Sequence, residues 1–213
     1  YDSVSRIFPT EMPNTQYWQK YKDKADGIVL LRDNTPQPMI HFLPKFMEYY
    51  NFTPEDLYHL TNRAATSLDE AWVNGKQVFE RDITCKNGYI HKVDGVMMSA
   101  DNMANIINNH PLMSTYASLL NRFSAPYYDA SATATYNRLY NNTDSVFVLR
   151  YFAENSAIGN LATDPDGQTV DAQLMYDPGW NEYIYSNTAG YDLHYDAGAM
   201  LVPTNKALEN WWN

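Results

Sequence analysis

The segment most informative about the structure reads DITCKNGYIHKVDGVMM over residues 82–98. It indicates a strand, a turn at Asn87-Gly88 and a second strand, because Asn-Gly supports the positive φ angles of a tight type I′ turn. A second dipeptide of this kind, Asn74-Gly75, separates Ala71–Val73 from Val78–Phe79. Two hairpin signals in succession predict an antiparallel sheet in this part of the chain.

Helical patterns surround this predicted sheet. Residues 39–50 carry apolar side chains at helical spacing, and Thr53-Pro54-Glu55-Asp56 is typical of a helix start with Thr53 as the N-cap. Further helices are predicted at residues 16–24, from 101 to the break at His110-Pro111, at 114–123, at 130–140, and from Thr204 or Asn205 onward. Strands are predicted at residues 27–31, 183–185 and 200–202, while the short apolar run at 145–152 suits either state. These elements predict an α+β fold in which antiparallel sheets, as a sandwich or wedge, pack with several α-helices.

Composition limits the classes of function. The chain has 213 residues, of which 45% are hydrophobic and 19% charged, as is typical of a globular protein. A formal net charge of -10 argues against a nucleic-acid partner, because the phosphate backbone would be repelled. The sequence has no run of about 18 apolar residues, so no segment is expected to span a membrane. Cys85 is the only cysteine, which excludes an intrachain disulfide.

Residue types that serve catalysis or metal binding are scattered along the sequence. It has no His-x-x-x-His or Cys-x-x-Cys spacing, no Gly-x-Ser-x-Gly, and no phosphate-loop or dinucleotide fingerprint. His91 and Asp94 are close together on a predicted strand but face opposite sides of it. We therefore expect no metal, no cofactor and no catalytic residue. Asp164-x-Asp166-Gly167 is compatible with a loose calcium loop or with an ordinary acidic turn.

Two separate segments resemble the fasciclin family. Residues 72–104 are similar to the end of a fasciclin domain, where an Asp-Ile strand, an Asn-Gly turn and an Ile-His strand follow one another. The matching residues are Asn74, Gly75, Asp82, Asn87, Gly88, His91 and Asp94. Residues 200–208 are similar to the opening strand and helix of such a domain, through Pro203, Thr204 and Asn205. The resemblance implies an extracellular adhesion module in which His91 and Asp94 stabilise the fold through hydrogen bonds.

The two segments occur in the order opposite to that of one complete domain. Residues 1–107 are predicted to hold the C-terminal portion of a fasciclin-like domain, from about residue 28, with an N-terminal extension. Residues 108–213 are predicted to hold the N-terminal portion of a following domain, with a long insertion at about 125–195. The chain is then either a piece of a longer tandem protein or one circularly permuted unit. In a permuted unit, the strand at 200–202 is expected to share a sheet with residues 90–98.

The resemblance implies a non-catalytic adhesion or ligand-binding protein, extracellular or at the bacterial cell surface, such as a Bacteroidetes-type lipoprotein of the outer membrane or a protein secreted to the periplasm. Its partner would be a cell-surface protein or a glycan, and membrane association would use a lipid anchor outside this chain. One alternative is a carbohydrate-binding module that uses aromatic residues of the insertion, namely Trp180, Tyr183, Tyr185 and Tyr191. A second alternative is a glycoside hydrolase, which would need two acidic side chains facing each other in a cleft.

Overall fold

The computed structural model describes residues 4–33, 41–61, 63–97, 101–156, 161–180 and 200–213. The chain forms two compact units: unit 1 comprises Tyr1–Pro36 and Asp101–Asn213, and unit 2 comprises Gln37–Ala100. Unit 2 is therefore an excursion of the chain between the two segments of unit 1. The assignment of residues 1–107 and 108–213 to portions of two fasciclin-like domains stays a prediction. Within the described ranges, no helix is long and apolar enough to cross a membrane.

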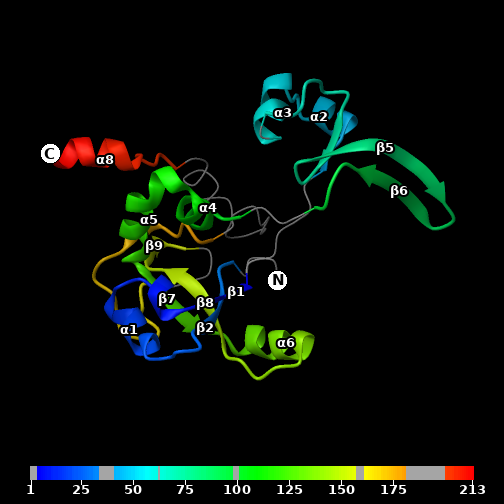
Figure 1. Ribbon diagram of the computed structural model, residues 1–213. Helices are drawn as coiled ribbons and strands as arrows, with labels where there is room; N and C mark the ends of the chain where they lie inside the picture. The colour runs from blue at the N-terminus through cyan, green and yellow to red at the C-terminus, as the bar shows by residue number, and fades with distance from the viewer. Residues whose placement is uncertain (1–3, 34–40, 62, 98–100, 157–160, 181–199) are drawn as a thin grey trace. The chain divides into compact units, whose positions relative to one another are not determined.

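A mixed sheet forms the centre of unit 1. Its strands lie in the order β1 (Val4–Ile7), β2 (Ile28–Leu31), β8 (Val146–Tyr151) and β7 (Ser124–Tyr128) (Figure 1). β1 and β7 run antiparallel to their neighbours, whereas β2 and β8 pair in parallel, with Leu30 opposite Phe147. The central strand β8 comes from the predicted insertion at 125–195, so the described part of that segment contributes to the unit 1 core.

Helices and short strands complete unit 1. The helices are α1 (Gln16–Lys22), α4 (Met103–Asn109), α5 (Ser114–Asn121), α6 (Ala130–Tyr140) and α8 (Asn205–Trp212), with the 3-10 turns η1 (Pro9–Glu11) and η2 (Pro111–Met113). The short strands β9 (Ala153–Asn155) and β10 (Leu174–Tyr176) form a separate parallel pair. The helices predicted in these parts of the sequence are confirmed. Trp18 fastens α1 to β7, since its indole Nε1 donates a hydrogen bond to the Ser124 carbonyl at 3.0 Å.

Both faces of the β2–β8 pair are covered, which explains the unbroken apolar sequence of these strands. Leu30 belongs to one core cluster, which includes Trp18 of α1. Val29, the residue before Leu30, faces the opposite side of the sheet and belongs to a second cluster, which includes Ala132 of α6. Strands buried on both faces read as continuous hydrophobic runs and not as alternation. The undecided run at 145–152 therefore folds as a strand, because β2 supplies its partner.

Asparagine and threonine side chains anchor α8 at the C-terminal end of the described chain. Thr204, one of the two capping residues that the sequence allows, is the N-cap of α8, and its hydroxyl accepts a hydrogen bond from the Ala207 N–H at 3.3 Å. The Asn205 side chain joins α8 to the start of α5. It accepts a hydrogen bond from the Thr115 N–H at 2.9 Å and donates one to the Pro111 carbonyl at 3.1 Å.

The strand predicted at residues 200–202 is wrong. These residues have no regular secondary structure, and in the described chain they pair with no strand of either unit. The sheet expected between residues 200–202 and 90–98 is therefore not among the sheets of the described residues. The polar anchor at Asn205, and not a strand pairing, fixes the position of α8 within unit 1.

Unit 2 is built on an antiparallel sheet with two short helices. The strands lie in the order β3 (His41–Phe42), β4 (Ala71–Val73), β5 (Lys76–Cys85) and β6 (Gly88–Val93), and the helices are α2 (Pro44–Tyr49) and α3 (Pro54–Leu60) (Figure 1). The core is small, and Met47, Leu57 and Trp72 are at most 5% exposed. α3 starts as predicted, with Thr53 and Asp56 forming a reciprocal capping box. The mixed α+β class is thus confirmed, while the assignment to the fasciclin fold stays a prediction.

The first predicted hairpin turn is confirmed. Asn74 and Gly75 have φ angles of 46° and 71°, and Val73 pairs with Lys76 across the turn. Positive φ at both loop residues is the geometry of a type I′ turn, whose twist matches that of the flanking strands. This turn sets the register of β4 and β5.

The second hairpin forms, but its turn does not lie at Asn87-Gly88 as predicted. Lys86 and Asn87 are the loop residues, and Gly88 is the first residue of β6, opposite Cys85. The φ angles of Asn87 and Gly88 lie outside the left-handed region. The observed register places Ile83 opposite Ile90, and this apolar cross-strand pair overrides the local turn preference.

Candidate binding surfaces

The β5–β6 hairpin of unit 2 exposes apolar side chains on both of its faces. Phe79, Tyr89 and Ile90 are 63%, 66% and 51% exposed. Tyr89 and Ile90 are neighbours on β6, so their side chains project from opposite faces of the ribbon. Beyond Val78, β5 pairs with β6 and with no other described strand, and a two-stranded ribbon by itself is only marginally stable in water. The exposed faces of this hairpin are therefore surfaces that gain from contact with a partner.

The outer edge of the hairpin is also open to pairing. In the part of the chain that the structure describes, β6 pairs with β5 and with no other strand. An edge strand presents backbone N–H and C=O groups that can accept an added strand. The charge of Lys92 on β6 is balanced by Glu80 across the hairpin, with Nζ and Oε2 2.5 Å apart. This edge thus lacks the unbalanced lysines that protect many edge strands from pairing.

The residues of the fasciclin-like motif shape this hairpin. Asp82 has a φ angle of 63° at a β-bulge in β5, and its N–H donates a hydrogen bond to His91 Nδ1 at 3.2 Å. Asp94 Oδ1 accepts a hydrogen bond from the Gln77 N–H at 3.0 Å. Both contacts lie at the protein surface. His91 and Asp94 therefore hold the bulge and the base of the hairpin, and each has a backbone partner of its own.

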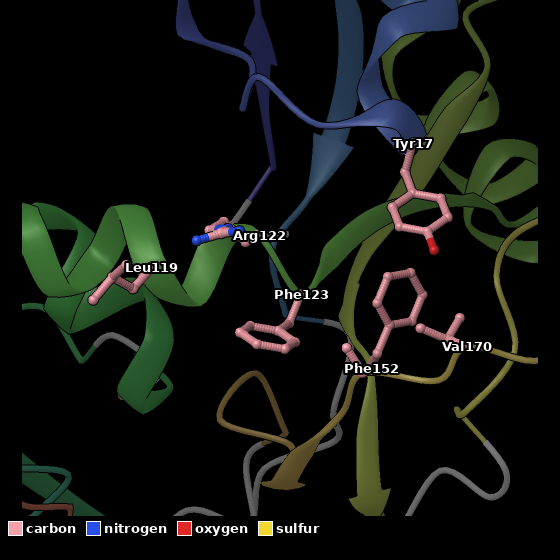
Figure 2. A pocket seen from close by; sticks show the side chains of 7 residues that line it. Tyr17, Leu119, Arg122, Phe123, Phe152 and Val170 are labelled. Atoms are coloured by element: carbon pink, nitrogen blue, oxygen red, sulfur yellow. The ribbon is translucent and has the colours of Figure 1, made fainter.

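Unit 1 contains a pocket of about 470 Å³ bordered by α1, the end of α5 and the segment after β8 (Figure 2). The side chains that line it are Tyr17, Leu119, Arg122, Phe123, Phe152, Val170 and Ala172. Phe152 and Val170 are 1% and 7% exposed and form the inner wall. Tyr17 packs edge-on against Phe152, with ring centroids 4.7 Å apart and an interplanar angle of 64°. The pocket is thus mainly aromatic and aliphatic.

Two polar groups border this pocket. Arg122 is the exposed residue that follows α5, and its guanidinium has no ion pair or side-chain hydrogen bond within the described ranges. The Tyr17 hydroxyl also has no hydrogen-bond partner among the described residues. It points toward Phe152 and Val170 inside the pocket (Figure 2). One cationic donor and one neutral donor are therefore available to a ligand.

Tyr127 supports the inner wall of the pocket from behind. Its ring packs against the cluster of Phe152 and Val170, and its hydroxyl donates a short hydrogen bond to the Thr163 carbonyl. The Arg150 guanidinium lies 5.4 Å from the Tyr127 ring centroid. Burial raises the pKa of the Tyr127 hydroxyl well above its ordinary value. Tyr127 therefore keeps its proton at neutral pH and acts as a fixed hydrogen-bond donor to the backbone.

The predicted glycan-binding aromatics fall in and next to the segment 181–199. Trp180 is partly buried, and its backbone N–H donates a hydrogen bond to the Asp177 carbonyl at 3.4 Å. Tyr183, Tyr185 and Tyr191 lie outside the described residues. The stacking platform predicted from these four residues therefore stays a prediction.

The acidic loop near residue 164 forms a turn that the Asp164 side chain stabilises. Asp164 Oδ1 accepts hydrogen bonds from the N–H groups of Asp166 and Gln168 at 2.9 and 2.8 Å. The Asp166 carboxylate pairs with Lys20, with a distance of 3.3 Å between Oδ1 and Nζ. The Asp164 side chain thus stabilises the turn, and the choice between a calcium loop and an acidic turn stays a prediction. No group of three or more His, Cys, Asp or Glu residues is arranged for a metal ion among the described residues.

Sequence reasoning did not identify the pocket, because its walls come from distant parts of the chain. Tyr17, Phe123 and Phe152 carry no shared motif, and only the pairing of β2, β8 and β7 brings them together. Comparison with known proteins adds no assignment for either surface: no family model, no curated protein and no solved structure matches this chain.

Proposed function

We propose that this chain is a non-catalytic, fasciclin-like adhesion protein of the bacterial cell surface, and that it binds a partner protein through the β5–β6 hairpin. The observation that carries the proposal is the open edge of β6 flanked by the exposed side chains of Tyr89 and Ile90. A partner strand added to β6 gains main-chain hydrogen bonds. The side chains on the two faces of β6 then supply selectivity.

Several features of the hairpin favour a protein partner over a glycan. Its exposed side chains are aliphatic as well as aromatic, and Phe79, Tyr89 and Ile90 are distributed over two faces. Sugar recognition uses a flat platform of rings, whereas strand addition uses both faces of an edge. The family-like motif falls on the same hairpin, where Asp82, His91 and Asp94 maintain its shape.

The contribution of the exposed side chains can be estimated. Full burial of one large apolar side chain contributes about 1.5–3 kcal/mol. Since Tyr89 is 66% and Ile90 51% exposed, their joint burial against a partner is worth roughly 2–3 kcal/mol. A double substitution Tyr89→Ser and Ile90→Ser should therefore weaken binding by roughly 30- to 150-fold.

The test uses microspheres coated with the full chain and surfaces coated with collagen, with fibronectin or with the chain itself. We expect retention on at least one protein surface, and a large loss with the Tyr89→Ser and Ile90→Ser double variant. Leu139→Ser is the matched control, because Leu139 is a 58% exposed apolar residue on α6 of unit 1. Free mannose, galactose and N-acetylglucosamine are added as competitors.

Retention that is equal for the double variant and the control would contradict the role of the hairpin. Retention abolished by one of the sugars would support the glycan alternative instead. Failure of the unmodified chain to adhere to every coated surface would count against the adhesive function. Far-UV circular dichroism of each variant establishes that a loss of retention does not arise from unfolding.

A further inference from the structure

We propose that the unit 1 pocket binds a small organic acid that has an apolar body and one carboxylate, such as an aryl-alkyl carboxylate. This inference does not rest on the adhesive function, because the pocket lies in unit 1 and the hairpin in unit 2. The pocket volume of about 470 Å³ falls in the range of roughly 300–1,000 Å³ that is usual for small-molecule sites.

The inner part of the pocket suits an aromatic or branched aliphatic group. Phe152 and Val170 form a buried apolar wall, with Tyr17 above Phe152 and Phe123 to its left in the view of Figure 2. The rings of Tyr17 and Phe152 are inclined at 64° to each other. Inclined rings offer both a face and an edge, so a third ring can pack in the offset or edge-to-face arrangements that aromatic pairs prefer.

The charge at the opening selects the polar end of the ligand. Arg122 lines the pocket on the α5 side, and the fold does not use its guanidinium for an ion pair within the described ranges. In a chain with a formal net charge of -10, such a cation beside an apolar pocket is a site for an anion. A guanidinium binds a carboxylate through two parallel hydrogen bonds.

The number and type of donors favour a monoanion over a phosphate. Among the residues that line the pocket, Arg122 is the one with a positive charge, and a phosphate dianion would need more than one cation or a set of backbone N–H donors. The Tyr17 hydroxyl provides a neutral donor on the α1 side of the pocket (Figure 2). A carboxylate at Arg122 and an apolar body next to Phe123 match this arrangement.

The experiment compares 4-phenylbutyrate with its uncharged analogue 4-phenylbutyramide by titration of the ¹⁵N-labelled full chain, followed by NMR. We expect saturable binding of the carboxylate, with shifts at residues of the pocket, and binding of the amide that is at least about tenfold weaker. Arg122→Gln should lower the affinity for the carboxylate by about tenfold and leave that for the amide unchanged. Arg138→Gln, at an exposed position on α6, is the matched control and should change neither affinity.

A second variant tests the cavity without altering the core. Ala172 is an exposed residue at the edge of the pocket, so Ala172→Trp should fill the opening and abolish binding of both compounds while the chain stays folded. Ala134→Trp, at an exposed position on α6, controls for the added indole. Equal affinities for carboxylate and amide, binding that survives Ala172→Trp, or the absence of saturable binding of 4-phenylbutyrate at millimolar concentration would each overturn the proposal.

Discussion

Replacement of Gly27 by alanine should strongly destabilise unit 1. Gly27 lies between α1 and β2 with a φ angle of +69°, and its N–H donates a hydrogen bond to the Lys24 carbonyl at 2.8 Å. A Cβ at this position would lie 2.1 Å from the carbonyl oxygen of Ile7. That oxygen belongs to the backbone of β1, which pairs with β2 through Ile7 opposite Ile28. Relief of the overlap therefore requires the end of the β1–β2 pair to separate.

Gly167 provides a matched control in the same unit. Its φ angle is +82°, its N–H donates to the Asp164 carbonyl at 2.9 Å, and a Cβ there would meet no atom within 4 Å. Gly167→Ala thus introduces the strain of a left-handed alanine without any steric overlap of its Cβ. A left-handed alanine costs about 1–2 kcal/mol, and the lower entropy of the unfolded chain offsets about 0.4–1 kcal/mol of it. We expect Gly167→Ala to lower the free energy of unfolding by roughly 0.5–1 kcal/mol.

Gly27→Ala adds the disruption of the sheet to the same strain. Ile7 is 4% exposed, and partial exposure of this side chain costs about 1–2 kcal/mol. Loss of the terminal pairing hydrogen bond between β1 and β2 costs about another 1 kcal/mol. The expected decrease in the free energy of unfolding is therefore roughly 2.5–4 kcal/mol, or a fall in melting temperature of about 10 °C.

Urea unfolding of the full chain, followed by circular dichroism, measures both changes. Amide hydrogen exchange of peptides from β1 and β2 assigns the loss to unit 1. Since α1 with Tyr17 lies between these two strands in sequence, Gly27→Ala should also weaken binding of 4-phenylbutyrate. If Gly27→Ala and Gly167→Ala destabilise the chain to within about 0.5 kcal/mol of each other, close approach of the backbone does not limit this position, and the reasoning is refuted.

Asn205→Leu removes the acceptor of the Thr115 N–H and the donor to the Pro111 carbonyl. The substitution should lower the free energy of unfolding by about 1–3 kcal/mol and speed amide hydrogen exchange in α8. Asn205→Asp keeps the acceptor and should show a smaller change. Equal exchange rates in α8 of the unmodified chain and both variants would contradict the anchoring role. Glu70 concerns unit 2, where hydrogen bonds from the hydroxyl and N–H of Thr66 and from Trp72 Nε1 lower the pKa of the Glu70 carboxyl. Because the pKa of Glu70 is lower in the folded state, its ionised carboxylate stabilises the fold at pH values above 4.5, and this stabilisation is lost as the pH falls through the lowered pKa. The urea midpoint of unit 2 should therefore fall on acidification, and Glu70→Gln should make that fall smaller. A Glu70→Gln profile that keeps the full acid dependence would assign the effect to other groups.

Local signals in the sequence identify those elements whose causes are local. The capping residues Thr53 and Thr204 start helices where predicted, because each satisfies a backbone N–H of its own helix. Asn74-Gly75 forms its predicted turn for the same reason, since both residues tolerate positive φ. The helix predicted from residue 39 begins only at Pro44, after the short strand β3. There, pairing with β4 prevails over helical spacing.

Several elements that depend on distant partners are missing from the sequence prediction. β1 and β7 were not expected, and both are edge strands of the unit 1 sheet. Pro126 in β7 indicates the end of a helix when only neighbouring residues are considered, but an edge strand tolerates proline because not every N–H is paired there. β2 and β8 pair in parallel, and the segment of the chain between them includes the whole of unit 2. No local pattern encodes the return of the chain to the same sheet after such an excursion.

The two candidate surfaces differ in predictability for the same physical reason. The β5–β6 hairpin is contiguous in sequence, so its turn, its bulge at Asp82 and its hydrogen bond to His91 leave a readable motif. The pocket needs the correct pairing of distant strands before Tyr17 and Phe152 can meet. A contiguous motif can persist through changes elsewhere in the chain, whereas the pocket depends on every element of the unit 1 sheet. Binding of a carboxylate therefore tests the long-range fold of unit 1, and adhesion through the hairpin tests only unit 2.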